Sequence, residues 1–210
     1  MKVRLAPALV ELLFVLLVAS SPAQAAPRVY ALDPAHSRLT IQVGKAGLFG
    51  FAGHEHQIVA GAFRGAATFD SDWLAQSSVD LTFDAGALRV TGQGEPPADV
   101  PQVQAAMVGA TCLDAGRFPT IRFVSTSVAA VGAAGPNGAE LVLRGTLTLH
   151  GVARPLTIRV HLDVTGETLE ATGATTLRQT DFGITPISKA GVVKVKDELT
   201  LSWRIRGRAP

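Results

Sequence analysis

The sequence is poor in cysteine, since Cys112 is the only one among its 210 residues. A disulfide within the chain is therefore excluded, and stability must come from a hydrophobic core. A lone cysteine with no histidine nearby in the sequence is typical of a small buried apolar side chain rather than of a reactive thiol. We therefore expect no cysteine-based catalysis and no metal site built on cysteine pairs.

Short enzyme motifs are also missing: there is no G-x-S-x-G, no Walker loop and no H-E-x-x-H. The 19 basic and 17 acidic residues nearly balance, giving a formal net charge of +2 at pH 7. No cluster of lysines and arginines stands out, although proteins that bind nucleic acid carry a basic patch or stripe. The sequence therefore indicates neither an enzyme nor a nucleic-acid-binding protein.

The first 25 residues predict a secretory signal peptide. Lys2 and Arg4 form a short basic region, residues 9–18 are almost wholly apolar, and Ala23-Gln24-Ala25 matches a cleavage site. The apolar run is about half of the roughly 20 residues that span a bilayer, although an uncleaved signal anchor is the alternative. We expect a periplasmic or secreted protein without a stable membrane anchor.

Residues 26–210 have the length of a single domain and the hydrophobic pattern of an all-β protein. Apolar and polar residues alternate with the period of a half-buried strand. The clearest runs are 38–43, 79–84, 141–149, 156–164 and 193–206, and weaker ones are 57–70, 120–128 and 168–178. Short polar turns between consecutive strands favour a lipocalin-like antiparallel up-and-down β-barrel of about eight strands, because closure removes exposed edges.

Two features interrupt the β pattern. Residues 99–110 predict a short inserted helix, with Asp99 as its cap and Pro101 in its first turn. Asp197 lies in phase with the apolar face of the last strand. A charge on an apolar face is costly, so we expect Asp197 to lie near a strand end or to have a polar partner.

The most distinctive local pattern is His54-Glu55-His56. On a strand, residues i and i+2 point the same way, about 6.5–7 Å apart, so two such imidazoles can share one metal ion. Zinc sites need three or four ligands, and the alternative is that these histidines only form hydrogen bonds at a barrel mouth. We therefore predict no cofactor and keep His54 and His56 as metal-ligand candidates. Candidates for a third ligand are His36, Asp33 and Asp181.

The predicted barrel interior is the main candidate site, because an eight-stranded barrel can hold one small ligand. Its inward side chains are apolar, so the alternatives are an apolar ligand and a filled core. The candidate lining residues are Leu39, Ile41, Val43, Phe49, Phe51, Leu81, Phe83, Met107, Phe123, Leu147, Leu149, Ile158, Val160, Phe182, Leu199, Leu201 and Trp203.

Several motifs run in the same order as those of a known family. They are Tyr30 to Ser37, Phe63-Arg64-Gly65 with Phe69-Asp70, Phe118 to Phe123, Leu147 to Leu156, Arg178 to Ile184, and Lys196 to Leu199. In these stretches, spanning about residues 29–206, the chain resembles the YceI family of lipocalin-like periplasmic proteins associated with polyisoprenoid binding.

The resemblance implies a barrel with a long apolar cavity for an isoprenoid-type lipid, such as a polyisoprenoid or a quinone-like molecule, and no catalytic residues. The chain departs from the common family pattern between Gly44 and His56, where the segment is longer and rich in Gly and Phe. A metal- or cofactor-binding protein using His54 and His56 is therefore the alternative function. Two further possibilities stay open. One is a barrel that has a filled core and binds a partner, and the other is a homodimer.

Overall fold

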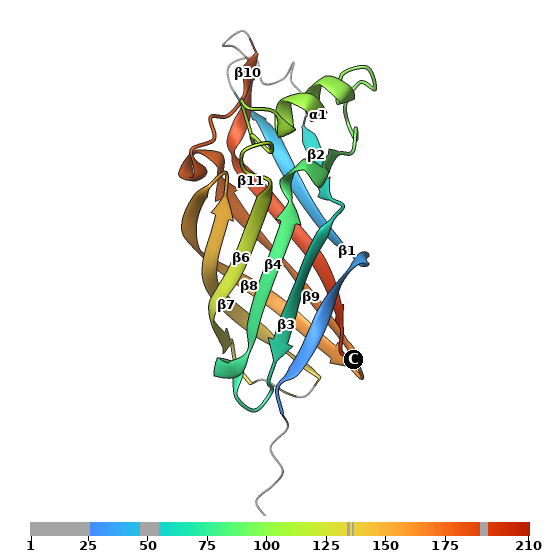
Figure 1. Cartoon of the computed structure of the whole chain (residues 1–210), viewed down its shortest axis with the longest axis vertical. Coiled ribbons are helices and arrows are strands. Elements are labelled where there is room, and N and C mark those ends of the chain that lie inside the picture. The colour runs from blue at the N-terminus through green and yellow to red at the C-terminus, as the bar shows by residue number, and fades with distance from the viewer. Residues whose placement is uncertain (1–25, 47–54, 134, 136, 190–192) are drawn as a thin grey trace, which may run out of the picture.

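The computed structural model describes residues 26–46, 55–133, 135, 137–189 and 193–210. These residues form a tall antiparallel β-barrel with a short helix at one end (Figure 1). The strands are β1 (Arg28–Ala46), β2 (His56–Ala60), β3 (Phe63–Phe69), β4 (Ser78–Asp84), β5 (Leu88–Val90), β6 (Thr120–Ala130), β7 (Gly138–Leu149), β8 (Val152–Thr165), β9 (Thr168–Arg178), β10 (Ser188–Lys189) and β11 (Val193–Arg208). The helix is α1 (Val100–Val108), and the 3-10 turns are η2 (Leu74–Gln76), η3 (Ala85–Ala87) and η4 (Gln179–Phe182).

Eight strands form the closed wall. Their order around the barrel is β1, β3, β4, β6, β7, β8, β9 and β11, and the antiparallel pairing of β11 with β1 closes the ring. The short strands β2, β5 and β10 extend the wall at the end that carries α1 (Figure 1). The predicted all-β barrel of about eight strands is confirmed. The single strand expected over 57–70 is wrong, because the chain forms β2 and β3 there, with a break at Gly61 and Ala62.

The predicted helix is also confirmed, but its cap residue does not make the expected side-chain hydrogen bond. Asp99 occupies the N-cap position, but its side chain makes no capping hydrogen bond. Pro101 lies in the first turn, where its missing N–H leaves no bond unmade. The helix lies across one end of the barrel (Figure 1), which we call the α1 end.

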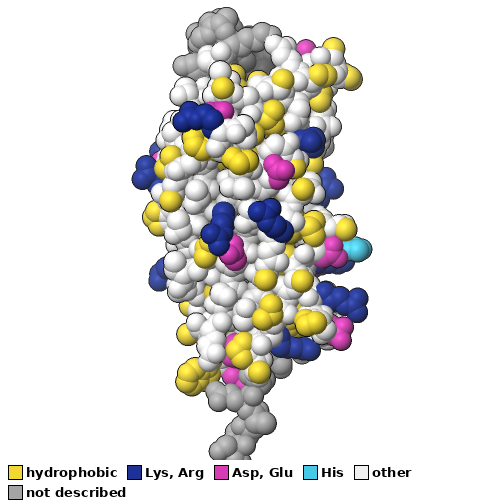
Figure 2. Space-filling view, in the orientation of Figure 1, with side chains coloured by type: hydrophobic (Ala, Val, Ile, Leu, Met, Phe, Trp, Pro, Cys, Tyr) yellow, Lys and Arg dark blue, Asp and Glu magenta, His cyan; other side chains and the backbone are white. Residues whose placement is uncertain are grey.

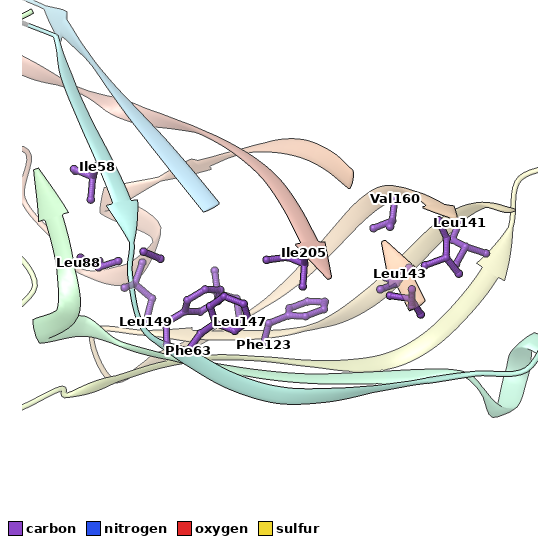
Figure 3. Packing of buried hydrophobic residues seen from close by; sticks show 14 of the residues in the cluster. Ile58, Phe63, Leu88, Phe123, Leu141, Leu143, Leu147, Leu149, Val160 and Ile205 are labelled. Carbon is purple, nitrogen blue, oxygen red and sulfur yellow. The ribbon is translucent and has the colours of Figure 1, made fainter. Parts of the chain in front are cut away.

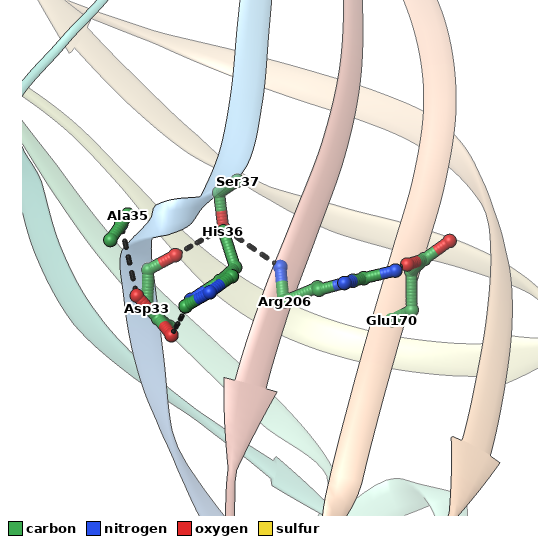
Figure 4. A network of polar contacts seen from close by, with 6 residues as sticks. All are labelled: Asp33, Ala35, His36, Ser37, Glu170 and Arg206. Atoms are coloured by element: carbon green, nitrogen blue, oxygen red, sulfur yellow. Dashed lines mark hydrogen bonds and ion pairs between the residues drawn. The ribbon is translucent and has the colours of Figure 1, made fainter.

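A corner in β1 interrupts the seam between β1 and β11. The register shifts between Asp33 and Arg38, around Pro34, which has no backbone N–H to donate. The Ser37 hydroxyl replaces part of the lost ladder, because it accepts a hydrogen bond from the Arg206 N–H at 2.9 Å and donates one to the Asp33 carbonyl (Figure 4). The corner is therefore held by side chains where the ladder is broken.

Side chains alternate between the interior and the outer surface along each long strand. On β7, Leu141, Leu143, Leu147 and Leu149 are all buried and project into the barrel (Figure 3). Gly145 lies between them, and a Cβ there would come within 2.7 Å of the Phe123 ring. An inward glycine on β7 therefore makes room for an inward aromatic side chain on β6.

The outer surface carries charged side chains of both signs. On the face shown in Figure 2, basic and acidic side chains are interspersed, with only scattered apolar ones between them. Around the barrel, ion pairs join neighbouring strands, such as Arg122 on β6 with Asp80 on β4 and Arg206 on β11 with Glu170 on β9. Among the described helices, none has the length and apolar character needed to cross a membrane.

Gly173 on β9 provides a test of this packing. A Cβ at this position would lie 2.4 Å from the Trp203 ring and 2.6 Å from the carbonyl oxygen of Arg159. Gly173→Ala is therefore expected to lower the free energy of unfolding by about 1–3 kcal/mol in urea denaturation. Gly116→Ala is the control, because no atom lies within 4 Å of its added methyl group. Equal stabilities of the two variants would contradict the tight contact.

Candidate functional site

The barrel encloses an elongated apolar cavity of about 360 Å³. On β11 its wall runs from Val195 to Ile205, and ten residues of strand cover about 33 Å. Strands in a barrel are tilted by about 35–45°, so the cavity extends for about 25 Å along the barrel axis. A volume of this size over such a length is a narrow channel rather than a round pocket.

The wall contains most of the residues predicted from the sequence. Those lining the cavity are Leu39, Ile41, Val43, Leu81, Phe83, Met107, Phe123, Leu147, Leu149, Ile158, Val160, Leu199, Leu201 and Trp203. Phe182 is buried in η4 but does not line the cavity, and Phe49 and Phe51 lie outside the described residues. The role of these residues as ligand contacts stays a prediction.

Other wall residues were missed. Those at the α1 end include Ile58, Leu88, Val90, Val103, Cys112, Leu113, Ile184, Ile187 and the ring of His56, and others, such as Phe69, Leu162 and Ile205, lie elsewhere along the wall. Many of those at the α1 end belong to short elements such as β2 and β5, in which five or three residues are too few to show a period of two. The α1-end lining therefore had no clear signal in the sequence.

The opposite end of the cavity is tightly packed. Tyr30 and Leu169, the largest fully buried side chains, lie there near the starts of β1 and β9. Tyr30 contacts Gly207, which pairs with Leu169 across the β11–β9 ladder. Buried side chains therefore pack around the cavity at the end away from α1.

At the α1 end, Asp197 fastens η4 to β11. Its carboxylate accepts hydrogen bonds from the Thr180 N–H at 2.9 Å and from the Thr180 hydroxyl at 2.7 Å. Asp197 lies in phase with the apolar face of its strand, and the expectation that it has a polar partner is confirmed. The Thr180 hydrogen bonds lower the pKa of Asp197 from its ordinary value of 3.8. Just after η4, Ile184 is buried and lines the cavity, so this contact helps to position the wall.

Replacing Asp197 tests that contact. A carboxyl whose pKa is lower in the folded state stabilises the fold above its unfolded pKa, and the contribution is lost as the pH falls through the folded value. Asp197→Asn should therefore lower the free energy of unfolding at pH 7, by at most about 1 kcal/mol since the group is largely exposed. Urea denaturation should show the difference from wild type shrinking as the pH falls below the ordinary pKa of 3.8; a difference independent of pH would contradict the account.

The histidines occupy separate places. His36 lies on the outer surface beside Asp33. His161 also lies outside, beside Glu140. A hydrogen bond with Glu140 and the nearby charge of Asp163 raise the pKa of His161. His56 lines the cavity, with its Nδ1 at 2.9 Å from Oε1 of Glu95. His54 lies outside the described residues, and among those described no three His, Cys, Asp or Glu side chains gather as metal ligands require. His36, Asp33 and Asp181 therefore do not complete a site with His56.

Cys112 is a half-buried part of the wall rather than an activated nucleophile. Burial raises the pKa of its thiol, which lowers the fraction of reactive thiolate at neutral pH. The expected small apolar role of Cys112 agrees with this position.

Comparison with known proteins identifies the family. The model of the YceI-like domain matches residues 30–206. The chain belongs to the YceI-like family. It is 30% identical over 180 residues to a UPF0312 protein of Shewanella putrefaciens, covering 82% of this chain and 84% of that one. A UPF0312 protein of Vibrio parahaemolyticus is 27% identical over 180 residues, covering 83% and 86% of the two chains.

Solved structures share the barrel of this YceI-like protein. BcnA of Burkholderia cenocepacia superposes with a TM-score of 0.66 at 20% identity, covering 83% of this chain and 98% of that one. A polyisoprenoid binding domain from Saccharophagus degradans, implicated in plant cell wall breakdown, gives a TM-score of 0.63 at 12% identity, covering 86% and 98%. At these identities the likeness establishes the common fold.

Proposed function

We propose that this YceI-like protein is a binding protein that holds a long isoprenoid-type lipid, a polyisoprenoid or quinone-like molecule, in the barrel cavity. The observation that carries the proposal is the narrow cavity of about 360 Å³, whose wall is almost entirely apolar from Val195 to Ile205. A flexible, unbranched or methyl-branched chain fits a long channel better than a compact ligand does.

The apolar wall is sufficient for tight binding without a charged clamp. Burying one CH₂ group contributes about 0.8 kcal/mol. Even at about 0.3 kcal/mol per heavy atom, a lipid of about 40 carbons would gain about 12 kcal/mol. The hydrophobic effect alone therefore gives such a ligand a favourable binding free energy, and recognition along the tail needs no polar motif.

Two further observations support the lipid proposal. The Saccharophagus domain with the same fold is described as polyisoprenoid binding. The signal-peptide pattern in residues 1–25 supports a periplasmic or secreted location, where a protein that shields an apolar molecule from water has an obvious use. We propose a carrier or store of lipid rather than an enzyme.

A charge in the channel should prevent lipid binding. Leu199 lines the cavity, whereas its neighbour Thr200 is exposed on the outside of β11. Leu199→Arg is expected to weaken the binding of diphenylhexatriene, a rod-shaped apolar dye, at least about tenfold, because a buried unpaired charge is costly. Thr200→Arg should bind the dye as wild type does. Fluorescence titration measures both affinities, and equal affinities would contradict a cavity site.

Because Leu199→Arg can also unfold the barrel, a cavity-filling variant completes the test. Ala171 lines the cavity and Ala174 on the same strand is exposed. Ala171→Phe should retain the barrel circular dichroism spectrum and reduce dye binding, since the added ring occupies the channel. Ala174→Phe is the matched control. Undiminished binding by folded Ala171→Phe would overturn the proposal.

A further inference from the structure

An acidic side chain is buried beside the α1 end of the cavity. Glu95 lies in the loop between β5 and α1, following the turn at Gly92 and Gly94, both of which have positive φ. Its side chain is only 1% exposed, and neither carboxylate oxygen has a well-aligned hydrogen-bond partner. Among the described residues, the basic group that contacts Glu95 is the imidazole of His56, at 2.9 Å from Nδ1 to Oε1.

This burial restricts the proton states of the pair. An unneutralised buried carboxylate is strongly disfavoured, so Glu95 is balanced either by an imidazolium or by its own proton. With an imidazolium, both ring nitrogens of His56 carry protons. With a protonated carboxyl, a proton on Oε2 would be buried without an acceptor, so the proton lies on Oε1 and is donated to Nδ1, and the neutral ring carries its own proton on Nε2. In both neutral states, His56 Nε2 is a hydrogen-bond donor.

His56 is also placed to meet a ligand. It lines the cavity, with Val43 as its β1 partner and Ile58 as the next inward residue on β2. Among the described wall residues, His56 and Cys112 have the only ionisable side chains. A wholly apolar ligand gains nothing from a buried ion pair, which two apolar side chains often replace without loss of stability. The pair therefore indicates a polar group on the ligand.

We propose that His56, neutralised by Glu95, is a head-group subsite that donates a hydrogen bond from Nε2 to an uncharged acceptor, specifically a carbonyl oxygen at one end of an isoprenoid-type lipid. This inference rests on the proposed lipid-binding function. A phosphate head would bring its own negative charge into a medium of low dielectric constant, where a pair that is neutral overall does not balance it. An alcohol would accept the bond but bury its own hydroxyl proton without a partner. A carbonyl, as in a ketone or a quinone, accepts this bond and brings no donor of its own that would be buried unpaired.

The test uses three probes with one isoprenoid tail: geranylgeranylacetone, which is a ketone, the hydrocarbon in which its carbonyl is replaced by CH₂, and geranylgeranyl monophosphate. Displacement of diphenylhexatriene from the purified protein gives each affinity. The variant is His56→Leu combined with Glu95→Leu, which avoids leaving either partner buried alone. The ratio of ketone to hydrocarbon affinity should fall about tenfold in this variant. An unchanged ratio would overturn the subsite.

Two further variants distinguish a specific role from a structural one. Glu95→Gln removes the carboxylate charge, so the affinity for the monophosphate should rise about tenfold while the hydrocarbon serves as the packing reference. A uniform loss for all three probes would indicate mere structural damage and overturn the subsite. His161→Leu with Glu140→Leu, an exposed pair on the outer surface, should leave the ratio at the wild-type value. A wild-type protein that binds none of the probes would instead overturn the lipid-binding function itself.

Discussion

The antiparallel pairing of β1 with β11 is the constraint on which the other features of this protein depend. It closes the sheet, and it sets Leu39 opposite Trp203, Ile41 opposite Leu201 and Val43 opposite Leu199. All six side chains line the cavity. A shift of one residue in this register would turn these side chains to the solvent side. The register that closes the barrel is therefore the same register that makes its interior apolar. The polar corner around Ser37 preserves the seam where Pro34 interrupts its hydrogen bonds.

Closure creates the interior, and side-chain size determines how much of it stays open. Phe123 and Trp203 occupy space that the inward glycines Gly145 and Gly173 leave free. Tyr30 and Leu169 pack one end, while α1 and η4 lie at the other, where His56 and Glu95 are placed. The wall thus suits an apolar tail along its length, and its polar pair lies at a single end. This polarity matches a molecule with a tail and a head.

The sequence predicted the long strands because each has two faces of different character. Residues 141–149 illustrate this, since the alternating leucines become the buried face of β7. A barrel with a filled core and a barrel with a cavity show the same alternation of apolar and polar residues. The cavity could therefore be recognised only from the strand register and side-chain packing of the folded chain. Glu95 could not have been predicted as buried, because Gly92-Gln93-Gly94-Glu95-Pro96-Pro97 has the composition of an exposed turn. In the folded chain its side chain lies against His56 of β2, which is distant in the sequence.

The central claim is that the barrel carries an isoprenoid-type lipid, and native mass spectrometry tests it most directly. The full chain would be expressed with its own N-terminal segment, purified without detergent, and analysed before and after extraction with organic solvent. The account predicts a one-to-one complex whose extracted ligand has a defined mass with repeating isoprene units and a carbonyl-bearing head. A protein that carries no lipid and takes none up when isoprenoid quinones are added would contradict the account.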